Sequence, residues 1–414
     1  MSIAPTSGLR SAPRILMVAP RWPCVGLLAE GLAREGCEVH RLLDLRGVFA
    51  PSDPGAQRRL FSWPDRRFSS TTRIASVFNR SFFDVIDGLV RSRGIDFVLP
   101  VLEPALYEMW KRPEAPWAPL VRPHIEPWQQ TLLLSKWSMS EAARGWGVDI
   151  PRQYSATDPE AVQAAVADLG LPVVVKDVVG GGGTRVVICS TLAEVTAAIS
   201  RLEATGHPDS DQPPMLQEYV PGTTYLAFGL FDDGRAVRLY AGAKVEQDPP
   251  GVGPSAVIRS VMEPELTEST LRVFAGLKWT GLAGADFVRR PDGSFAFLEV
   301  NPRPSATLGA GLEAGVELAG PYAEILRGGH PAADLSLTPD LDYRIPISRV
   351  LAHFSRGSAR EVAAVLRDRP TWDAIPWGDR GEVTYRAIHR VRNDRRRRQQ
   401  NRPDTSRRAE TENR

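Results

Sequence analysis

The stretch from Gly281 to Pro304, GLAGADFVRRPDGSFAFLEVNPRP, constrains the fold of this chain more than any other. Two short runs that suit β-strands flank Pro291-Asp292-Gly293, so we expect a β-hairpin. If the loop is the two-residue Asp292-Gly293, counting outward from the turn places Asp286 opposite Glu299. A three-residue loop with a bulge also suits these turn residues, and it would move Asp286 off the Glu299 face.

One face of this expected hairpin has the chemistry of a metal site. Side chains alternate faces along a strand, so Asn301 joins Glu299 on one face. Two opposed carboxylates repel each other, and the simplest neutraliser is a hard divalent cation held by oxygen ligands, such as Mg²⁺ between carboxylates and nucleotide phosphates. Arg303, two residues further on, can reach the same anionic ligand. The alternative is a surface hairpin with scattered charge.

Length and composition predict a globular chain with more than one domain. The 414 residues suffice for two or three cores, and the hydrophobic share of 43% and charged share of 24% are ordinary for soluble proteins. Cys24, Cys37 and Cys189 show neither metal-ligand spacing nor a disulfide pattern, which fits a reducing cytoplasm. There is no apolar leader and no apolar run of membrane-spanning length, so we expect a cytoplasmic protein.

The first part of the chain is expected to form a parallel α/β sheet. Arg14–Ala19 and Cys37–Leu43 are strand candidates on either side of a helix over Val25–Glu35, and this order favours parallel strands. The turn after the first strand lacks G-x-G-x-x-G, so we expect no dinucleotide site there. Glu103 follows another buried strand, Ile95–Val101, at the strand end where open α/β sheets contact ligands, although the start of a helix is the favoured explanation.

Three further expectations concern the connections and helices that follow. Residues 47–75 are rich in Pro, Arg and Ser and are expected to form a long loop. Residues 111–128 are dense in proline and indicate a domain boundary. Gln129–Gly147 is expected to be a single helix.

The stretch Leu171–Ser190, LPVVVKDVVGGGGTRVVICS, is the second informative one. Its first strand carries Lys176, and a buried unpaired ammonium is costly, so this lysine must reach solvent or meet an anion. Gly180–Gly183 then expose backbone N–H groups that suit phosphate oxygens, although a flexible hairpin tip explains them as well. The run is not a P-loop, because no Gly-Lys-Ser/Thr follows it.

The segments between these two stretches are expected to be mostly strands. Met215–Val220 is a strand candidate that Pro221-Gly222 ends, and Tyr225–Phe231 pairs with Ala236–Lys244 as a hairpin. The loop over 246–255 has the composition of a lid, with a plain connection as the alternative.

Taken in order, these pieces resemble an ATP-grasp ligase. The matching parts run from about Gln129 to Leu318: Lys136 before GVDIP, then LPVVVKDVVGGGGTRVV, QEYVPG, the Lys244 strand, ADF and FLEVNPRP. SAVIRSV and NPRPSATLG look closest to the branch that includes carbamoyl-phosphate synthase and many amino-acid ligases. The resemblance implies an α/β N-terminal Rossmann-like (pre-ATP-grasp) domain, followed by an α+β ATP-grasp fold whose two subdomains hold ATP between them.

The implied domain order covers the whole chain. An N-terminal domain over 1–125 precedes an ATP-grasp domain over 126–335, with a small clamp subdomain over about 126–215 and a large one over about 216–335. A packing segment over 336–385 and a basic tail over 386–414 follow. The tail has almost no apolar residues, so we expect it to be disordered and solvated, with nucleic-acid contact as the less favoured alternative.

The resemblance assigns phosphate contacts to two lysines and a loop. Lys136 and Lys176 would contact the ATP phosphates. The loop with Gly181, Gly182 and Gly183 would close over them.

The resemblance also assigns the metal ligands and the charged groups near the reacting phosphate. Asp286, Glu299 and Asn301 would hold Mg²⁺, with Mn²⁺ as an alternative. Arg303 would face the transferring phosphoryl group or the acyl phosphate, and Lys244 would lie near the γ-phosphate.

By the same resemblance, the hinge would be formed by Glu218, Tyr219 and Val220. Backbone atoms of Glu218 and Val220 would read the adenine edge.

The chain departs from the family pattern at two places. Residues 222–225 lack the acidic residue that suits the ribose hydroxyls, so ribose contact falls to Glu218 or to a hydroxyl. Asp177 stands where a proline is usual.

The implied function is an ATP-dependent, ADP-forming ligase that activates a carboxylate as an acyl phosphate and joins it to an amine, with amino-acid-like substrates. One alternative is a bicarbonate-activating enzyme of the carboxylase type, and another is a nucleotide-binding regulator or scaffold whose basic tail docks on nucleic acid. The six scattered histidines are not needed as nucleophiles. The oligomeric state stays open, with a homodimer among the alternatives.

Overall fold

The computed structural model describes residues 12–19, 23–44, 67–74, 77, 81–179, 185–205, 212–247 and 255–345. These residues belong to one compact unit made of Met1–Gly47 and Asp65–Ile345, whereas the second unit, Val48–Pro64 with Pro346–Arg414, lies outside the described residues. The expected glycine loop at 180–183, most of the 246–255 loop, the packing segment beyond Ile345 and the basic tail also lie outside them.

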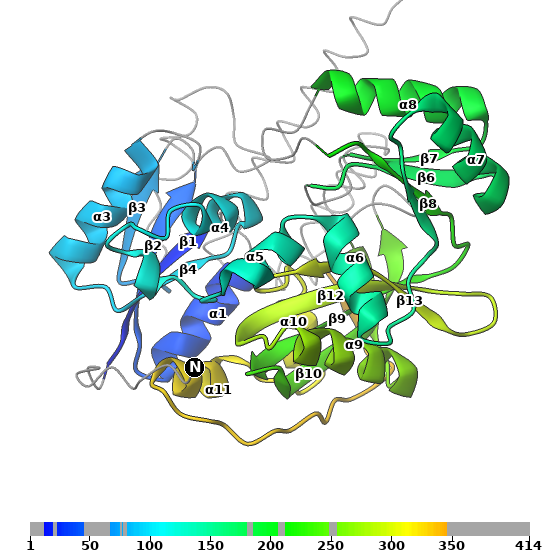
Figure 1. Cartoon of the computed structure of the whole chain (residues 1–414). Coiled ribbons are helices and arrows are strands. Elements are labelled where there is room, and N and C mark those ends of the chain that lie inside the picture. Colours follow the sequence, from blue (N-terminus) through cyan, green and yellow to red (C-terminus); the bar gives the residue numbers. More distant parts are fainter. Residues whose placement is uncertain are drawn as a thin grey trace, which may run out of the picture. The chain divides into compact units, whose positions relative to one another are not determined.

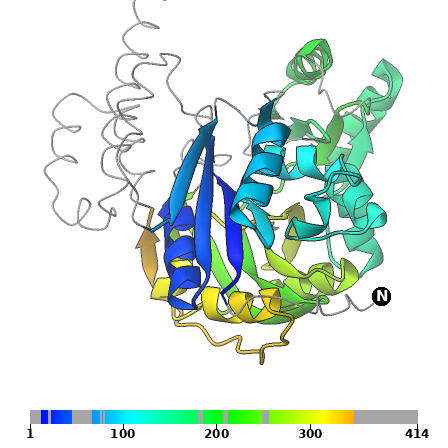
Figure 2. The ribbon, with the colours of Figure 1, turned by 90° about the vertical axis from the view of Figure 1, so that its left-hand side faces the viewer.

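The N-terminal part of the described chain contains a four-stranded parallel sheet, which confirms the parallel α/β expectation. Its strand order is β3-β2-β1-β4, and all neighbouring strands pair in parallel (Figure 2). The Rossmann-like label stays a prediction. The elements are β1 Arg14–Ala19, α1 Pro23–Arg34, β2 Glu38–Asp44, β3 Ser70–Ile74, α3 Ser81–Arg93, β4 Phe97–Pro100 and α4 Glu103–Trp110.

The expectation of a continuous loop over 47–75 is wrong at its C-terminal end. Ser70–Ile74 is strand β3, which pairs with β2 from His40↔Ser70 to Asp44↔Ile74. Its two threonines and terminal isoleucine suit a strand, and the open edge of β2 supplies the partner for its backbone groups. Tertiary pairing therefore overrides the loop-like composition of the surrounding segment.

The rest of the described chain forms two antiparallel sheets, with strand orders β13-β12-β9-β10-β11-β14 and β5-β8-β6-β7 (Figure 1). The strands are β5 Gln153–Ser155, β6 Val173–Lys176, β7 Val186–Cys189, β8 Met215–Glu218, β9 Thr224–Asp232, β10 Arg235–Gln247, β11 Ser255–Ser260, β12 Gly281–Arg289, β13 Phe295–Asn301 and β14 Asp342–Arg344. The helices are η1 Ala118–Leu120, α5 Pro127–Leu133, α6 Lys136–Gly145, α7 Pro159–Leu169, α8 Leu192–Thr205, α9 Pro264–Gly276, α10 Leu308–Glu313 and α11 Ala319–Leu326. Among the described residues, no helix has both the length and the apolar character needed to cross a membrane.

The expected single helix over Gln129–Gly147 is wrong, because two helices, α5 and α6, meet at Leu134 and Ser135. Ser135 is in an extended conformation, and its hydroxyl oxygen accepts a hydrogen bond from the Ser138 backbone N–H at 3.2 Å. A serine in this role starts a new helix, because it satisfies an N–H group that has no partner in the first turn. The break places Lys136 at the first position of α6.

Each antiparallel sheet buries one face under helices. Helices α7 and α8 cover one face of the four-stranded sheet, and Val173 and Val175 of β6 pack there (Figure 1). Because side chains alternate along a strand, Lys176 faces the opposite side. Helix α9 covers one face of the six-stranded sheet, with Phe274 stacked on Phe231 at a centroid distance of 4.0 Å.

The opposite face of the six-stranded sheet is only partly covered. A second core joins it to the parallel sheet through side chains such as Phe228, Tyr240, Met17 and Leu99, with α1, α10 and α11 contributing to the same core.

Gly222, two residues after the predicted hinge, lies against the backbone of β12. A Cβ added at Gly222 would lie 2.0 Å from the Arg289 carbonyl oxygen, and the Arg289 N–H donates a hydrogen bond to the Thr223 carbonyl at 3.0 Å. We expect Gly222→Ala to lower the free energy of unfolding by about 1–3 kcal/mol, since the strand backbone must shift. Thermal or denaturant unfolding would measure this loss.

Gly88→Ala is the matched control for this substitution. Gly88 lies within α3, and an added Cβ there meets nothing within 4 Å. Alanine favours a helix over glycine by up to about 1 kcal/mol, so this variant should be as stable as the parent chain or more stable. Equal effects at the two glycines would contradict a close backbone approach at Gly222.

Candidate functional site

The β12–β13 hairpin places Asp286 opposite Glu299, which confirms the predicted pairing. The turn that produces this pairing is not the expected two-residue turn. The loop is the three-residue alternative, closed by a hydrogen bond from the Gly293 N–H to the Arg290 carbonyl at 3.0 Å. A bulge then leaves Leu298 of β13 without a partner on β12, and this extra residue restores the pairing of the two carboxylates.

Each of these carboxylates faces a lysine. Lys244 lies on the same sheet face as Asp286, because Gly242, Leu226 and Asp286 form one row across β10, β9 and β12. The Lys244 ammonium lies 2.9 Å from Asp286 Oδ2. On the other side, Lys136 Nζ lies 3.9 Å from Glu299 Oε2.

Burial and the neighbouring charges act in opposite directions on Asp286. Burial raises the pKa of the Asp286 carboxyl, the Lys244 ammonium lowers it, and the Glu299 carboxylate raises it again. The net pKa is above the ordinary value for an aspartate. Two closely opposed acids with separate lysine partners thus form a cluster in which a cation would relieve repulsion.

The oxygen donors of the hairpin fit a cation that arrives together with phosphate groups. The described residues contain no group of three or more Asp, Glu, His or Cys side chains that could hold a metal. The oxygen donors present are the carboxylates of Asp286 and Glu299 and the amide oxygen of Asn301, which follows Glu299 by two residues on β13. Mg²⁺ is commonly bound through one or two carboxylates, with phosphate and water completing its six ligands, so this donor set suits it.

Lys176 is the most buried cationic side chain of the predicted site. The residue is only 5% exposed, and its ammonium has no hydrogen-bond or ion-pair partner among the described residues. Burial and the positive charge of Lys136 lower the pKa of Lys176 to about 8, against a smaller opposing effect of Glu299. A buried ammonium without a partner is unfavourable, so Lys176 is suited to bind an anion, as the sequence predicts.

The glycines Gly181, Gly182 and Gly183 lie outside the described residues, so their role stays a prediction. The two ends of their loop are joined. Asp177 is buried, and Arg185 Nε lies 2.5 Å from its Oδ2, while the Asp177 N–H donates a hydrogen bond to the Arg185 carbonyl at 3.2 Å. The aspartate that replaces the usual proline therefore serves as an anchor for Arg185.

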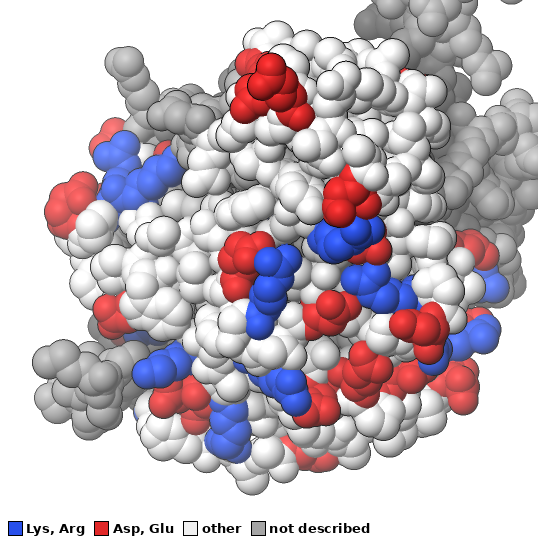
Figure 3. All heavy atoms as spheres, turned by 45° about the vertical axis from the view of Figure 1, so that its right-hand side comes forward, with Lys and Arg blue, Asp and Glu red and all other residues white. Residues whose placement is uncertain are grey.

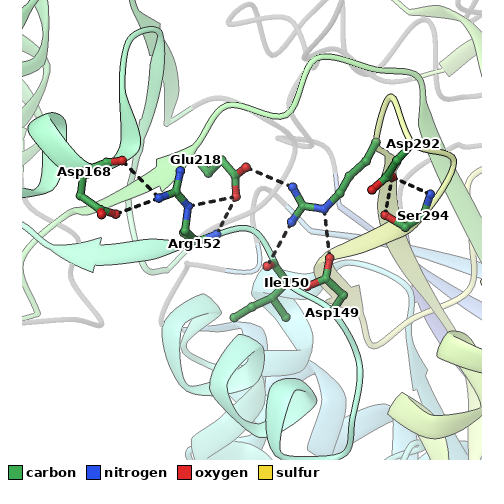
Figure 4. A network of polar contacts seen from close by, with 8 residues as sticks. Asp149, Ile150, Arg152, Asp168, Glu218, Asp292 and Ser294 are labelled. Atoms are coloured by element: carbon green, nitrogen blue, oxygen red, sulfur yellow. Dashed lines mark hydrogen bonds and ion pairs between the residues drawn. The ribbon is translucent and has the colours of Figure 1, made fainter.

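The predicted hinge residues Glu218, Tyr219 and Val220 follow one another at the end of β8. Tyr219 is exposed, and the Val220 N–H makes no hydrogen bond with the other described residues. The Glu218 carboxylate accepts a hydrogen bond from the Arg152 backbone N–H at 3.0 Å and pairs with Arg290 Nη1 at 3.1 Å (Figure 4). These bonds occupy the Glu218 side chain, so the expectation that it contacts the ribose loses support.

Arg290 is the centre of this network and links the tip of the β12–β13 hairpin to the segment before β5. Besides Glu218, it bonds Asp149 Oδ2 at 3.0 Å and the Ile150 carbonyl at 3.4 Å (Figure 4). We expect Arg290→Gln to lower the free energy of unfolding by about 1–2 kcal/mol, because three partners lose a charged donor. Denaturant unfolding would measure the change.

Arg34→Gln is the control for this prediction, because Arg34 makes a single exposed i,i+4 pair with Glu30. Pairs of this kind contribute about 0.3–0.5 kcal/mol. If the two variants lose the same small amount of stability, the network does not anchor the hairpin tip.

Glu103 is a site residue that the sequence analysis set aside. It is the first residue of α4, as the favoured explanation requires, and it also belongs to the site. Arg303 Nε donates a hydrogen bond to Glu103 Oε1 at 3.0 Å, and Arg303 Nη2 donates to Asn301 Oδ1 at 3.4 Å. The available signal was its place just after β4, at the ligand-binding edge of a parallel sheet.

An open pocket connects Glu103 with the lysine–carboxylate cluster. The pocket is open to solvent. The polar side chains that line it are Glu103, Tyr107, Lys136, Glu299 and Asn301. The apolar ones are Leu133, Leu134, Met139, Val178 and Val300.

The antiparallel sheets, with a lysine–carboxylate cluster at their open edge, define an ATP-grasp architecture. Comparison with protein families agrees, since residues 134–307 match the ATP-grasp domain. This part of the chain is an ATP-grasp domain.

Known proteins similar to this chain include a ligase and two solved enzymes. The phosphoribosylamine–glycine ligase of Synechocystis is 25% identical over 189 residues, which is 39% of this chain and 44% of that protein. The chain spans less than half the length of the curated relatives it matches.

Biotin carboxylase from Campylobacter jejuni, solved as a β-γ-ATP complex, has a TM-score of 0.64 at 14% identity, over 79% of this chain and 74% of that chain. The L-amino acid ligase from Bacillus licheniformis has a TM-score of 0.57 at 16% identity, over 77% and 75%. These TM-scores show a shared fold, and the coverage of 77–79% of this chain extends it beyond residues 134–307.

Proposed function

We propose that this chain is an ATP-dependent, ADP-forming ligase that activates a carboxylate as an acyl phosphate and joins it to an amine. The observation that carries the proposal is the convergence of Lys136, Lys176 and Lys244 on Asp286 and Glu299 beside an open pocket. The fold shared with known ligases supports it. In this arrangement, residues 126–335 bind ATP and residues 1–125 contribute to the acid and amine sites.

The reaction balances without a protein nucleophile. A carboxylate oxygen attacks the γ-phosphorus of ATP, the bond to the β-phosphate oxygen breaks, and ADP leaves. The amine then attacks the acyl carbon, inorganic phosphate leaves with the acyl C–O electron pair, and the nitrogen loses a proton to solvent. Protein groups align the reactants and offset negative charge, which is the main catalytic demand of phosphoryl transfer.

The lysines and Arg303 supply that charge. Lys176 lacks an anion among the described residues, so a phosphate group would be its first close partner. Lys136 and Lys244 pair with the hairpin carboxylates and would turn to phosphate oxygens when those carboxylates bind a cation. Mg²⁺, or Mn²⁺, held by Asp286, Glu299 and Asn301 would neutralise part of the triphosphate charge.

The hinge assignment rests on backbone groups. The exposed end of β8 leaves the Val220 N–H available for the adenine edge. The Glu218 side chain holds the hinge segment to Arg152 and Arg290. We therefore assign the contact of Glu218 with the adenine to its backbone and not to its side chain.

The walls of the pocket favour the ligase over the bicarbonate-activating alternative. A bicarbonate-activating enzyme needs a small polar site, whereas apolar side chains make up half of this lining. The nucleic-acid alternative depends on the basic tail over 386–414, which lies outside the described residues. On the face drawn in Figure 3, the described acidic and basic side chains lie interspersed and form no continuous basic surface. An organic acid with an apolar part therefore fits the pocket better.

A screen for ADP release tests the proposal. The full chain with Mg²⁺ and ATP would be given pairs from a panel of amino acids, small organic acids and amines, with bicarbonate alone as a separate arm. ADP release that requires both an acid and an amine is the expected result. Release with bicarbonate alone would favour the carboxylase alternative, and no release in any arm would reject the enzyme.

A further inference from the structure

The first turn of α6 is bonded to the four-stranded antiparallel sheet. The Lys136 backbone N–H donates a hydrogen bond to the Val178 carbonyl at 2.7 Å, and the Ser135 hydroxyl donates one to Gln212 Oε1 at 3.2 Å. Val178 follows β6 and Gln212 precedes β8, so both bonds hold the start of the helix to this sheet. Lys136 also reaches the six-stranded sheet, because its ammonium lies 3.9 Å from Glu299 Oε2.

The rest of α6 packs on the six-stranded sheet (Figure 1). Met139 and Ala143 are buried in the core of that sheet, and α6 contacts β13 directly. One helix is thus attached to both antiparallel sheets, by its start to one and along its length to the other. A change in the angle between these sheets must displace Lys136 or break its backbone hydrogen bond.

Trp137 packs this junction on the side of the four-stranded antiparallel sheet. It lies against an apolar cluster made of Val178, Val179 and Met215. Met215 is fully buried, and it pairs with Lys176 across β8 and β6. Because directly paired residues share one sheet face, Met215 lies beside Lys176 on the face turned away from α7 and α8. The Trp137 indole therefore packs on the immediate neighbour of Lys176.

The two lysines on either side of this contact repel each other. Burial lowers the pKa of Lys176, and the positive charge of Lys136 lowers it further. Repulsion between like charges favours their separation, so apolar packing must oppose it. Trp137 is suited to this, because an aromatic ring system gives a large apolar contact with few rotatable bonds. It follows Lys136 in the sequence and packs beside Lys176, so it supports both.

We propose that Trp137 is a positioning residue that holds Lys136 and Lys176 at the spacing that a polyphosphate requires. The inference rests on the proposed function and adds a residue to which that function assigns no ligand contact. Trp137 acts through the two lysines, so it affects the phosphate end of a nucleotide. The adenine end depends on the backbone near Glu218, whose side chain is held separately by Arg152 and Arg290.

Calorimetric titration of the full chain with AMP, ADP and a non-hydrolysable ATP analogue, each with Mg²⁺, tests the inference. Trp137→Ala should raise the Kd of the ATP analogue by about tenfold or more and leave the Kd of AMP within about threefold. ADP should lie between them. A loss that grows with the number of phosphates indicates displaced lysines, whereas general loosening of the protein would weaken the binding of all three nucleotides alike.

Two further variants separate position from stability. Trp137→Phe should bind the ATP analogue within about threefold of wild type, because a phenyl ring still packs on Met215. Trp128→Ala is the matched control, since Trp128 lies in the neighbouring helix α5 and is 43% exposed, and its nucleotide affinities should not change. Thermal unfolding checks that each variant is folded. If Trp137→Ala does not fold, Trp137→Leu should show the same dependence on phosphate number.

Three results would overturn the inference. They are unchanged binding of the ATP analogue by Trp137→Ala, an equal loss for AMP and the ATP analogue, and failure of Trp137→Phe to restore the affinity.

These outcomes are separate from those of the proposed function. Nucleotide binding that ignores Trp137, combined with ADP release in the screen, would leave the ligase standing and remove the positioning role. Phosphate-dependent losses without ADP release in any arm would support the positioning role and reject the enzyme.

Discussion

Glu299→Gln combined with Asn301→Ala is expected to abolish ADP formation from Mg²⁺ and ATP while leaving the protein folded. The two substitutions remove a carboxylate and an amide oxygen from the face that carries Asp286. Loss of one preorganised electrostatic contact typically costs about 10²–10³ in rate, so two lost ligands should reduce turnover by about three orders of magnitude or more. ADP release would be measured with the acid and amine that the screen identifies.

Stability should move little or improve in this double variant. The Glu299 carboxylate raises the pKa of Asp286, which means that the two acids repel each other in the protein without a cation. Removing one of them relieves that repulsion. Asp292→Asn is the matched control, since Asp292 lies in the turn of the same hairpin and accepts hydrogen bonds from Ser294 (Figure 4). Normal turnover by the double variant would reject the metal assignment.

The second large effect is expected for Lys176→Met, which should lose activity and gain stability. Loss of a phosphate contact should lower turnover by about 10²–10³. Stability should rise, because methionine has similar length and carries no charge into a site where the ammonium has no partner among the described residues. The gain at pH 7 is at most on the order of 3 kcal/mol.

The pH dependence of this gain has a definite sign. The pKa of Lys176 is about 8 in the folded chain and 10.5 in the absence of its surroundings. Below pH 8 both states are protonated, and burial of the charge costs the folded state its full penalty. Between about pH 8 and 10.5 only the unfolded chain keeps the proton, so the folded wild-type chain becomes more stable as pH rises.

Denaturant unfolding of wild-type chain and Lys176→Met at pH 7, 8 and 9 measures this difference. The advantage of the variant should shrink as pH rises through 8. Lys111→Met is the control, because Lys111 pairs with Glu108 on the surface of α4. A Lys176→Met chain that is less stable than wild type at pH 7 would show that Lys176 has a partner in the folded protein.

Much of the fold follows from local patterns in the sequence. The strands β1, β6 and β12 and the helix α1 lie at or near their predicted residues, because each combines a clear hydrophobic pattern with a recognisable start or stop. The expectation failed where a partner distant in the sequence decides the outcome. Strand β3 forms only because β2 offers an open edge.

The candidate site, like the fold, could be predicted only where local patterns decide the structure. Opposed carboxylates on the hairpin and an anion-seeking Lys176 follow from residue type and alternation, and the structure brings them together. The pair of Glu103 and Arg303 could not be predicted, because no local pattern links residues so far apart in the chain. The choice of Lys244 as the partner of Asp286 likewise depends on the order of strands β10, β9 and β12.

The unpaired Leu298 on β13 has a consequence for how this gene can change. The three-residue loop and the bulge each offset the strands by one position, and only their combination brings Glu299 to Asp286. Shortening the loop by a single residue would shift the register, so that Glu299 would no longer face Asp286. Insertions and deletions here should therefore survive selection only when a compensating length change occurs within the same hairpin.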